Sequence, residues 1–306
     1  MEHQSQGDLT KSDLTKSDLT KLSDSELMSL ERQIAKRYIG RLSWFMVAWP
    51  VLNLAVWVSL WPLVLSGTLS IWAAFPLAAL TCILAYLPCH DAQHDIYGRP
   101  GDQTRWLNQM IGHLSPIPIA LSYRFLRETH IEHHKHANNP ALDPDYPTNS
   151  GNSIREFLSN VYLSMQPNSE GQVAYMNCLT RLDTDEARKA IRDQVLVVLV
   201  QHGILFAMAA NGHALTAFIL WWVPLKIALF YNRFYLSWLP HFPDPQRGRY
   251  RDTHSFTSWL GNLSSLGMTA HVVHHLHPRI PLDLTPAAMR DLKPVLLARG
   301  VDLGSA

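Results

Sequence analysis

Two long uncharged stretches dominate the pattern of hydrophobic and polar positions along this 306-residue chain. Residues 42–90 and 194–225 contain no Asp, Glu, Lys or Arg. A helix needs about 20 apolar residues to cross a bilayer. The first stretch is therefore long enough for two spans, and so is the second if its last span continues past Lys226. The pattern predicts four helical spans, at Trp44–Leu65, Ile71–Pro88, Val195–Ala210 and Ala214–Tyr231.

An alternative interpretation is a pair of buried helical hairpins in a soluble protein. Helices of soluble proteins average about 11–12 residues, which is shorter than the predicted spans. We therefore expect an all-α integral membrane protein with four transmembrane helices in two hairpins. Two further apolar regions, Trp106–Leu121 and Thr257–Ala270, are too short and too broken for spans. They predict re-entrant or interfacial segments, which membranes tolerate where such segments pack against protein.

The distribution of basic residues predicts how the spans are oriented. The two short turns, at residues 66–69 and 211–213, contain no Lys or Arg. Basic residues are instead frequent before the first span, between the second and third, and after the fourth. By the positive-inside rule these segments lie in the cytoplasm. We therefore predict an inner (cytoplasmic) membrane protein whose two turns face outward and whose termini are both cytoplasmic.

The residues before the first span divide into two parts. Residues 1–22 repeat Asp-Leu-Thr-Lys three times, which is typical of a disordered polar tail. Ser23 followed by Glu26 matches a capping box and predicts the start of an amphipathic cytosolic helix over residues 23–41. Residues 42–306 then form the membrane domain.

Three short histidine clusters lie just beyond the ends of the predicted spans. Residues three and four apart share one face of a helix, so each cluster directs two or three imidazoles toward one point. Imidazole is a common ligand of transition metals, and four ligands usually satisfy one structural zinc ion. Eight histidines therefore point to two metal ions on the cytoplasmic side. The clusters are His90 with His94, His130 with His133 and His134, and His271 with His274 and His275.

Other features of the composition exclude some classes of partner and cofactor. Cys82, Cys89 and Cys178 form no CxxC pair, so we expect reduced thiols in a reducing compartment and no disulfide framework. The net charge is +1 and no basic-aromatic patch is visible, so we expect no nucleic-acid partner. Flavin, haem and iron–sulfur motifs are also not visible in the sequence.

The sequence around these clusters resembles the membrane fatty acid desaturase family. The segments that carry the resemblance are His90-Asp-Ala-Gln-His94, Asn139-Pro-Ala-Leu-Asp-Pro-Asp145 and His274-His-Leu-His-Pro-Arg-Ile-Pro281. The resemblance implies a cytosolic helical cap with a di-iron site, O2 as co-substrate and an external electron donor of the ferredoxin or cytochrome type. It also implies a long-chain lipid substrate, with fatty acyl desaturation as the first choice, and adds His241 to the eight cluster histidines as a candidate ligand.

The chain departs from the pattern of the family at two positions. Asp95 follows His94 where the family usually has Gly, and Ser237 stands four residues before His241 where many desaturases have Asn. The phrase Trp238-Leu-Pro-His241 is more similar to bacterial carotenoid ketolases and hydroxylases, so carotenoid ring oxidation is the alternative reaction. A membrane metal transporter is the non-enzyme alternative, but transporters place their sites near the bilayer midplane rather than past the span ends.

Six further residues near the clusters are candidates for supporting the ligands. A ligating imidazole usually donates its second N–H to a carboxylate or carbonyl, which fixes its orientation. Asp91, Asp95, Glu132 and Asp145 are acids within reach of the clusters in sequence, and His136 and His277 adjoin the second and third clusters.

Overall fold

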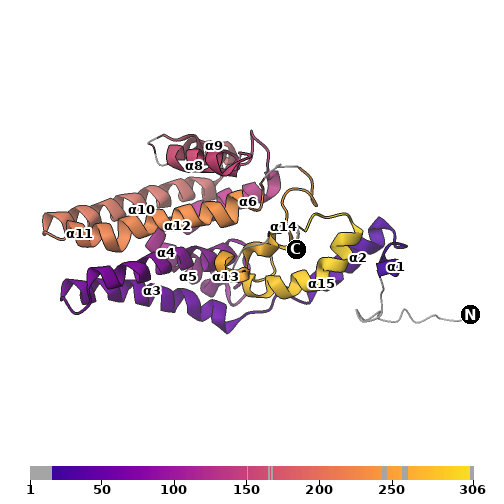
Figure 1. Cartoon of the computed structure of the whole chain (residues 1–306), viewed down its shortest axis with the longest axis horizontal. Coiled ribbons are helices and arrows are strands. Elements are labelled where there is room, and N and C mark those ends of the chain that lie inside the picture. Colours follow the sequence, from indigo (N-terminus) through magenta and orange to yellow (C-terminus); the bar gives the residue numbers. More distant parts are fainter. Residues whose placement is uncertain are drawn as a thin grey trace, which may run out of the picture.

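Helices are the only regular secondary structure in the residues that the computed structural model describes, which are 16–149, 151–164, 166, 168–242, 247–256 and 261–303. Figure 1 shows long helices lying side by side, with both hairpin turns at one end and α1, α2 and α15 toward the other. We call this second end, to which further short helices contribute, the cap. The expected all-α architecture is confirmed for this part of the chain.

The first hairpin consists of α3 (Trp44–Leu65) and α4 (Ile71–Gln93). Gly67 adopts a φ of +74° in the turn between them, a conformation that glycine reaches without steric cost. Asn53 lies within α3 and donates a hydrogen bond of 2.8 Å to the carbonyl of Thr81 on α4. The bounds of α3 are those predicted, whereas α4 continues five residues past the predicted end at Pro88. One unbroken helix therefore leads from the first turn to the first histidine cluster.

The second hairpin joins α10 (Asp185–Ala210) to one continuous helical rod, Ala214–Trp238. The rod contains two π-helical segments, whose wider turns have i→i+5 hydrogen bonds. Both hairpin partners are longer than the predicted spans, and all four long helices are long and apolar enough to cross a membrane. The rod is composed of α11 (Ala214–Ala217), η2 (Phe218–Trp222), α12 (Val223–Asn232) and η3 (Arg233–Trp238).

Six short helices connect the two hairpins. They are α5 (Arg105–Leu114), η1 (Ile117–Ile119), α6 (Tyr123–His136), α7 (Tyr146–Asn149), α8 (Ile154–Ser164) and α9 (Glu170–Leu182). Ser122 caps α6 by accepting a hydrogen bond from the backbone N–H of Phe125. The apolar region predicted to be re-entrant or interfacial contains α5 and η1, which do not form a span.

The cap is completed by helices from both ends of the chain. α2 (Asp24–Lys36) begins at the predicted capping box, because Ser23 and Glu26 bond to each other's backbone N–H groups, but it ends before residue 41. The C-terminal part contains α13 (Asn262–Ser265), η4 (Met268–Ala270), α14 (His271–Leu276), η5 (Leu282–Leu284) and α15 (Thr285–Ala298).

The predicted polar tail lies mostly outside the described residues. Its last part includes α1 (Lys16–Leu19), in which Leu19 is buried. For residues 1–15, disorder stays a prediction. Residues 257–260 of the second broken apolar region also lie outside the described part, and the remainder of that region forms α13 and η4.

Candidate metal centre

The last turn of α4, the helix α6 and the helix α14 each carry one of the three predicted histidine clusters. His94 is the C-cap residue directly after α4, and Asp95, which follows it, has a φ of +56° that turns the chain away. His241 follows the rod just beyond η3, at its cap end. Four segments that are far apart in the sequence thus place all nine candidate histidines in one region of the fold.

The first metal-binding arrangement combines all three clusters. Nitrogen atoms of His90, His94, His130 and His274 all lie within 4.8 Å of one another. The Nε2 atoms of His94 and His130 are 3.0 Å apart. Two nitrogens that each bond the same ion at about 2.1 Å lie about 3 Å apart when they occupy adjacent coordination positions. This group of four imidazoles therefore has the spacing of ligands to a single ion.

A second arrangement forms beside the first. Nitrogen atoms of His133, His241 and His275 lie within 4.8 Å of one another. The Nε2 atom of His271 is 3.1 Å from Nε2 of His275, which brings a fourth imidazole to this group. The ring of His241 is 5.1 Å from that of His133 and 5.7 Å from that of His271, measured between centroids.

His134 lies between the two groups. Its Nε2 atom is 3.0 Å from Nε2 of His130 and equally far from Nε2 of His274, both in the first group. Its ring stacks on His275 of the second group at a centroid distance of 4.3 Å. The structure thus brings together all nine predicted histidines: two adjoining groups of four, with His134 in contact with both.

The hydrogen-bonding state of these imidazoles fits metal ligation. Both ring nitrogens of His90 and the Nε2 of His241 are buried without a hydrogen-bond partner, which is costly for a polar atom in a protein interior. A metal ion would satisfy such nitrogens. Histidine is the residue type that suits iron, zinc, copper and nickel, so the donor set fits two transition-metal ions but does not by itself select one metal.

The electrostatic environment keeps most of the set neutral. Burial, followed by the effect of neighbouring imidazoles, holds the pKa values of His130, His134, His274 and His275 well below their usual range. The same causes lower the pKa of His271. A neutral imidazole has a free lone pair, which metal binding requires.

His133 and His241 are each oriented through their Nδ1 atom. Nδ1 of His133 lies 2.9 Å from Oδ1 of Asp143, and Nδ1 of His241 donates to the carbonyl of Asp252 at 2.8 Å. Burial alone would lower the pKa of His133, but the adjacent charge of Asp143 raises it to about 9. Burial lowers the pKa of His241 to about 3. In both residues Nδ1 makes the outer hydrogen bond, so Nε2 is the atom that would bind a metal, and His133 would release a proton when it does so.

Asp143 was missed among the candidate supporting residues. It lies within the Asn139–Asp145 segment that carries the resemblance, so the segment was identified but its most buried acid was not. Of the acids that were named, Asp145 comes nearest to a ligand, with Oδ2 3.8 Å from Nδ1 of His133. Its other oxygen accepts a hydrogen bond from Tyr175.

The other predicted supporting residues contact different groups. Asp91 accepts the backbone N–H of Leu282, and Asp95 pairs with Arg105 and Arg127. Glu132 pairs with Lys135, Arg181 and His136, and His277 lies 3.0 Å from Glu31. These residues fix the segments around the clusters rather than the ligand rings themselves.

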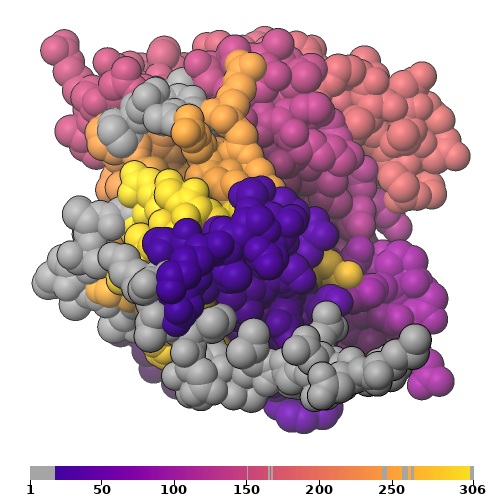
Figure 2. Space-filling view, turned by 90° about the vertical axis from the view of Figure 1, so that its right-hand side faces the viewer, coloured from indigo at the N-terminus to yellow at the C-terminus, as the bar shows by residue number. Residues whose placement is uncertain are grey.

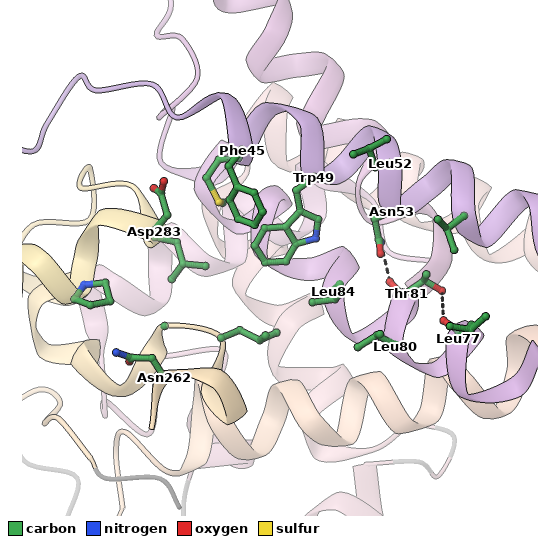
Figure 3. A pocket seen from close by; sticks show the side chains of 16 residues that line it. Phe45, Trp49, Leu52, Asn53, Leu77, Leu80, Thr81, Leu84, Asn262 and Asp283 are labelled. Carbon is green, nitrogen blue, oxygen red and sulfur yellow. Dashed lines mark hydrogen bonds between the residues drawn. The ribbon is translucent and has the colours of Figure 1, made fainter. Parts of the chain in front are cut away.

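An apolar groove of about 580 Å³ lies along the first hairpin, and Figure 3 shows it from close by. Phe45, Trp49 and Leu52 of α3 face Leu80 and Leu84 of α4 across it. Its cap end is lined by residues of the C-terminal part that include Asn262, Leu282 and Asp283. Leu282 at this end donates its backbone N–H to Asp91, the residue that follows His90 in the chain.

Comparison with known proteins decides the family. The sequence model of the family described as "Fatty acid desaturase" matches residues 66–304, which is most of the chain and includes all nine histidines. The chain belongs to the fatty acid desaturase family. This membership confirms the resemblance and makes the protein a desaturase-like oxidoreductase with membrane-type helices.

One curated fatty acid desaturase is also similar to this chain. It is an sn-1 acyl-lipid omega-3 desaturase (ferredoxin) from Nostoc sp. (strain 36), 23% identical over 261 residues. The alignment covers 74% of this chain and 69% of the relative. Helix α2 lies before the residues that match the family model.

Proposed function

We propose that this protein is an O2-dependent di-iron desaturase that introduces a double bond into the acyl chain of a membrane lipid. The observation that carries the proposal is the convergence of nine histidines from four segments into two adjoining ligand sets. The family and the acyl-lipid relative support the same reaction class.

Two irons would be held by the nine histidines, which are His90, His94, His130, His133, His134, His241, His271, His274 and His275. When bound, iron supplies the oxygen activation that removal of hydrogen from an unactivated C–H bond requires. The overall reaction converts a –CH2–CH2– unit and O2, with two electrons and two protons, into –CH=CH– and two waters. The electrons must come from a separate donor, since the sequence contains no visible redox motif besides the histidines.

The protein itself supplies orientation and exclusion of water. Asp143 and the Asp252 carbonyl fix the rings of His133 and His241, as outer hydrogen bonds do in other metal sites. His90, His133, His241 and His271 are at most 3% exposed. A site closed in this way protects a reactive oxidant from water and side reactions.

The groove along α3 and α4 supports a substrate with a long apolar chain. It lies on two helices that are long and apolar enough to cross a membrane, and its lining residue Leu282 is bonded to Asp91, the residue after His90, so a bilayer lipid could enter the groove without passing through water. The name of the Nostoc relative also supports an acyl lipid, and its "(ferredoxin)" supports an electron donor of the same kind. The positive-inside pattern supports a cytoplasmic-membrane location with the cap facing the cytoplasm.

The test is expression of the chain in two hosts, one that makes carotenoids and one that does not, with analysis of lipids and pigments. We expect new unsaturated acyl chains in both hosts, and none in cells that express His133→Ala or His274→Ala. Keto- or hydroxy-carotenoids with unchanged acyl chains would instead establish the carotenoid alternative suggested by Trp238–His241. Metal accumulation without a change in either lipid class would favour transport.

A further inference from the structure

The third histidine cluster is supported from behind by α2, near the N-terminus. Helix α14 carries His271, His274 and His275, and its remaining apolar residues pack into a separate cluster. Val272, Val273 and Leu276 of α14 belong to the same buried cluster as Leu27 and Ile34 of α2, and α15 packs against both helices. Every residue of this short helix thus either joins the candidate metal centre or packs into the cluster that includes α2.

Glu31 is the one charged residue of α2 that is fully buried, with a side chain 0% exposed. Its Oε1 atom lies 3.0 Å from Nε2 of His277 and 3.4 Å from the guanidinium of Arg249. Its Oε2 atom accepts a hydrogen bond of 2.9 Å from Tyr250. The guanidinium of Arg299 lies 3.7 Å from the same oxygen and 4.4 Å from the ring centroid of Tyr250.

These contacts connect four parts of the cap. Arg249 and Tyr250 belong to the segment that leads to Asp252, whose carbonyl orients His241. His277 follows the ligand His275 by two residues, and its backbone N–H bonds to the carbonyl of Val273 within α14. Arg299 follows α15 and also pairs with Asp24 at the start of α2. A buried carboxylate on α2 is therefore joined both to the third cluster and to the segment that orients His241.

The carboxylate remains charged in this position. Burial raises the pKa of Glu31, but the contacts with His277, Tyr250 and Arg249 outweigh burial and hold it below its usual value. Viewed from the cap end, α2 covers the surface beside α15 (Figure 2), which packs against it. The charge therefore faces inward, toward the centre, and not toward solvent.

We infer that Glu31 is a positioning residue for the metal centre: through His277 and the Arg249–Tyr250 pair, it fixes α14 and the His241 segment relative to each other. The inference rests on the proposed iron site. It assigns to α2, which lies outside the residues matched to the desaturase family, a part in forming the second ligand set.

The experiment compares Glu31→Gln and Glu31→Ala with Glu26→Gln as a matched control. Glu26 lies on the same helix, is exposed and bonds only within its own capping box, which a glutamine can also complete. Each full-length protein is purified in detergent. Iron per chain, affinity for ferrous iron by chelator competition, and the visible absorption spectrum of the iron-loaded protein are then measured. The melting temperature of the chelator-treated protein reports folding separately from the site.

We expect iron binding about tenfold weaker in Glu31→Gln, weaker still in Glu31→Ala, and an altered spectrum in both, which is the size of effect that residues supporting metal ligands have. The control should match the wild type. A His277→Ala variant should reproduce the loss, and adding Glu31→Ala to it should lower the affinity by less than the two separate losses combined.

Three results separate the explanations. Wild-type affinity and spectrum in Glu31→Gln would overturn the inference, even if the melting temperature of the metal-free protein falls, because the residue would then serve only stability. If Glu31→Ala does not fold, the glutamine variant decides alone. Failure of the wild type itself to bind iron would instead overturn the proposed function.

Discussion

Replacing Asp143 by Asn tests whether the second ligand set is oriented as the structure indicates. The Asp143 side chain is 0% exposed and receives three hydrogen bonds. They come from Nδ1 of His133 at 2.9 Å, the backbone N–H of Asn138 at 2.8 Å and the backbone N–H of Asp145 at 2.9 Å. The substitution keeps the shape of the side chain and removes its charge, so it isolates the electrostatic part of the support.

The size of the effect follows from these contacts. A hydrogen bond to a charged group contributes about 1.5–3 kcal/mol and a neutral one about 0.5–1.5 kcal/mol, so the bond to His133 should weaken by about 1–1.5 kcal/mol. That difference corresponds to roughly tenfold weaker metal binding. The amide must also turn its NH2 group toward one of the three donors, which leaves a buried N–H without an acceptor and destabilises the fold by about 1–3 kcal/mol.

The assay is a competition titration of ferrous iron against a chelator, combined with thermal unfolding of the metal-free protein. Asp183→Asn is the matched control, because Asp183 is exposed, pairs only with Arg188 and has a φ of +46° that asparagine tolerates well. We expect one of the two irons to be lost first from Asp143→Asn. Iron affinity equal to the wild type at both sites would refute the role of Asp143 and the orientation of His133 with it.

Three further predictions concern ligands, topology and pH. His133→Ala and His274→Ala should each abolish activity and lower the iron content while the chain still inserts in membranes; full activity in either would contradict the ligand assignment. Reporter fusions at Gly67 and Gly212 should report the outer side and fusions at Gly151 the inner side, and an outer signal at Gly151 would overturn the orientation. In the folded, chelator-treated protein the pKa values of four imidazoles are lowered, those of His130, His134, His274 and His275. Below about pH 6.5 the unfolded chain therefore binds protons at these residues that the folded chain does not bind. The melting temperature should therefore fall as the pH drops below that value, and a flat profile from pH 7 to 5 would show that these imidazoles are not held neutral.

The sequence predicted the presence of four long apolar helices and the grouping of the histidines, because both have strong local patterns. A long run without charged residues predicts a span because a charged side chain is costly to bury in a bilayer. For α3, the predicted and observed bounds are identical. Spacings of three and four residues determine which histidines share a helical face. Both signals are contained in short windows, so they do not depend on knowing the tertiary structure.

The supporting residues were harder to predict because they are determined by contacts between distant segments. Asp91 and Asp95 are adjacent to ligands in sequence but face Leu282 and the pair Arg105 and Arg127. Asp143 is ten residues from His133, and only the turn after α6 brings the two together. Proximity in sequence therefore did not single out Asp143, and burial alone would not have done so, because Asp91 is buried as well. Its contact with His133 distinguishes Asp143.

The π-helical segment η3 has a consequence for how this chain tolerates changes in length. A π-helical segment accommodates one more residue than an α-helical path of the same geometry, and η3 comes directly before the Leu239–His241 segment. Deleting one residue within Arg233–Trp238 converts the wide turn to an α-helical one and leaves the two flanks facing as before. A deletion between Trp238 and His241 lies beyond the wide turn, so we expect it to turn the imidazole of His241 away from His133. The two deletions should therefore differ in their effect on His241. The extra residue of η3 is the one that the helix can lose while the imidazole keeps its direction.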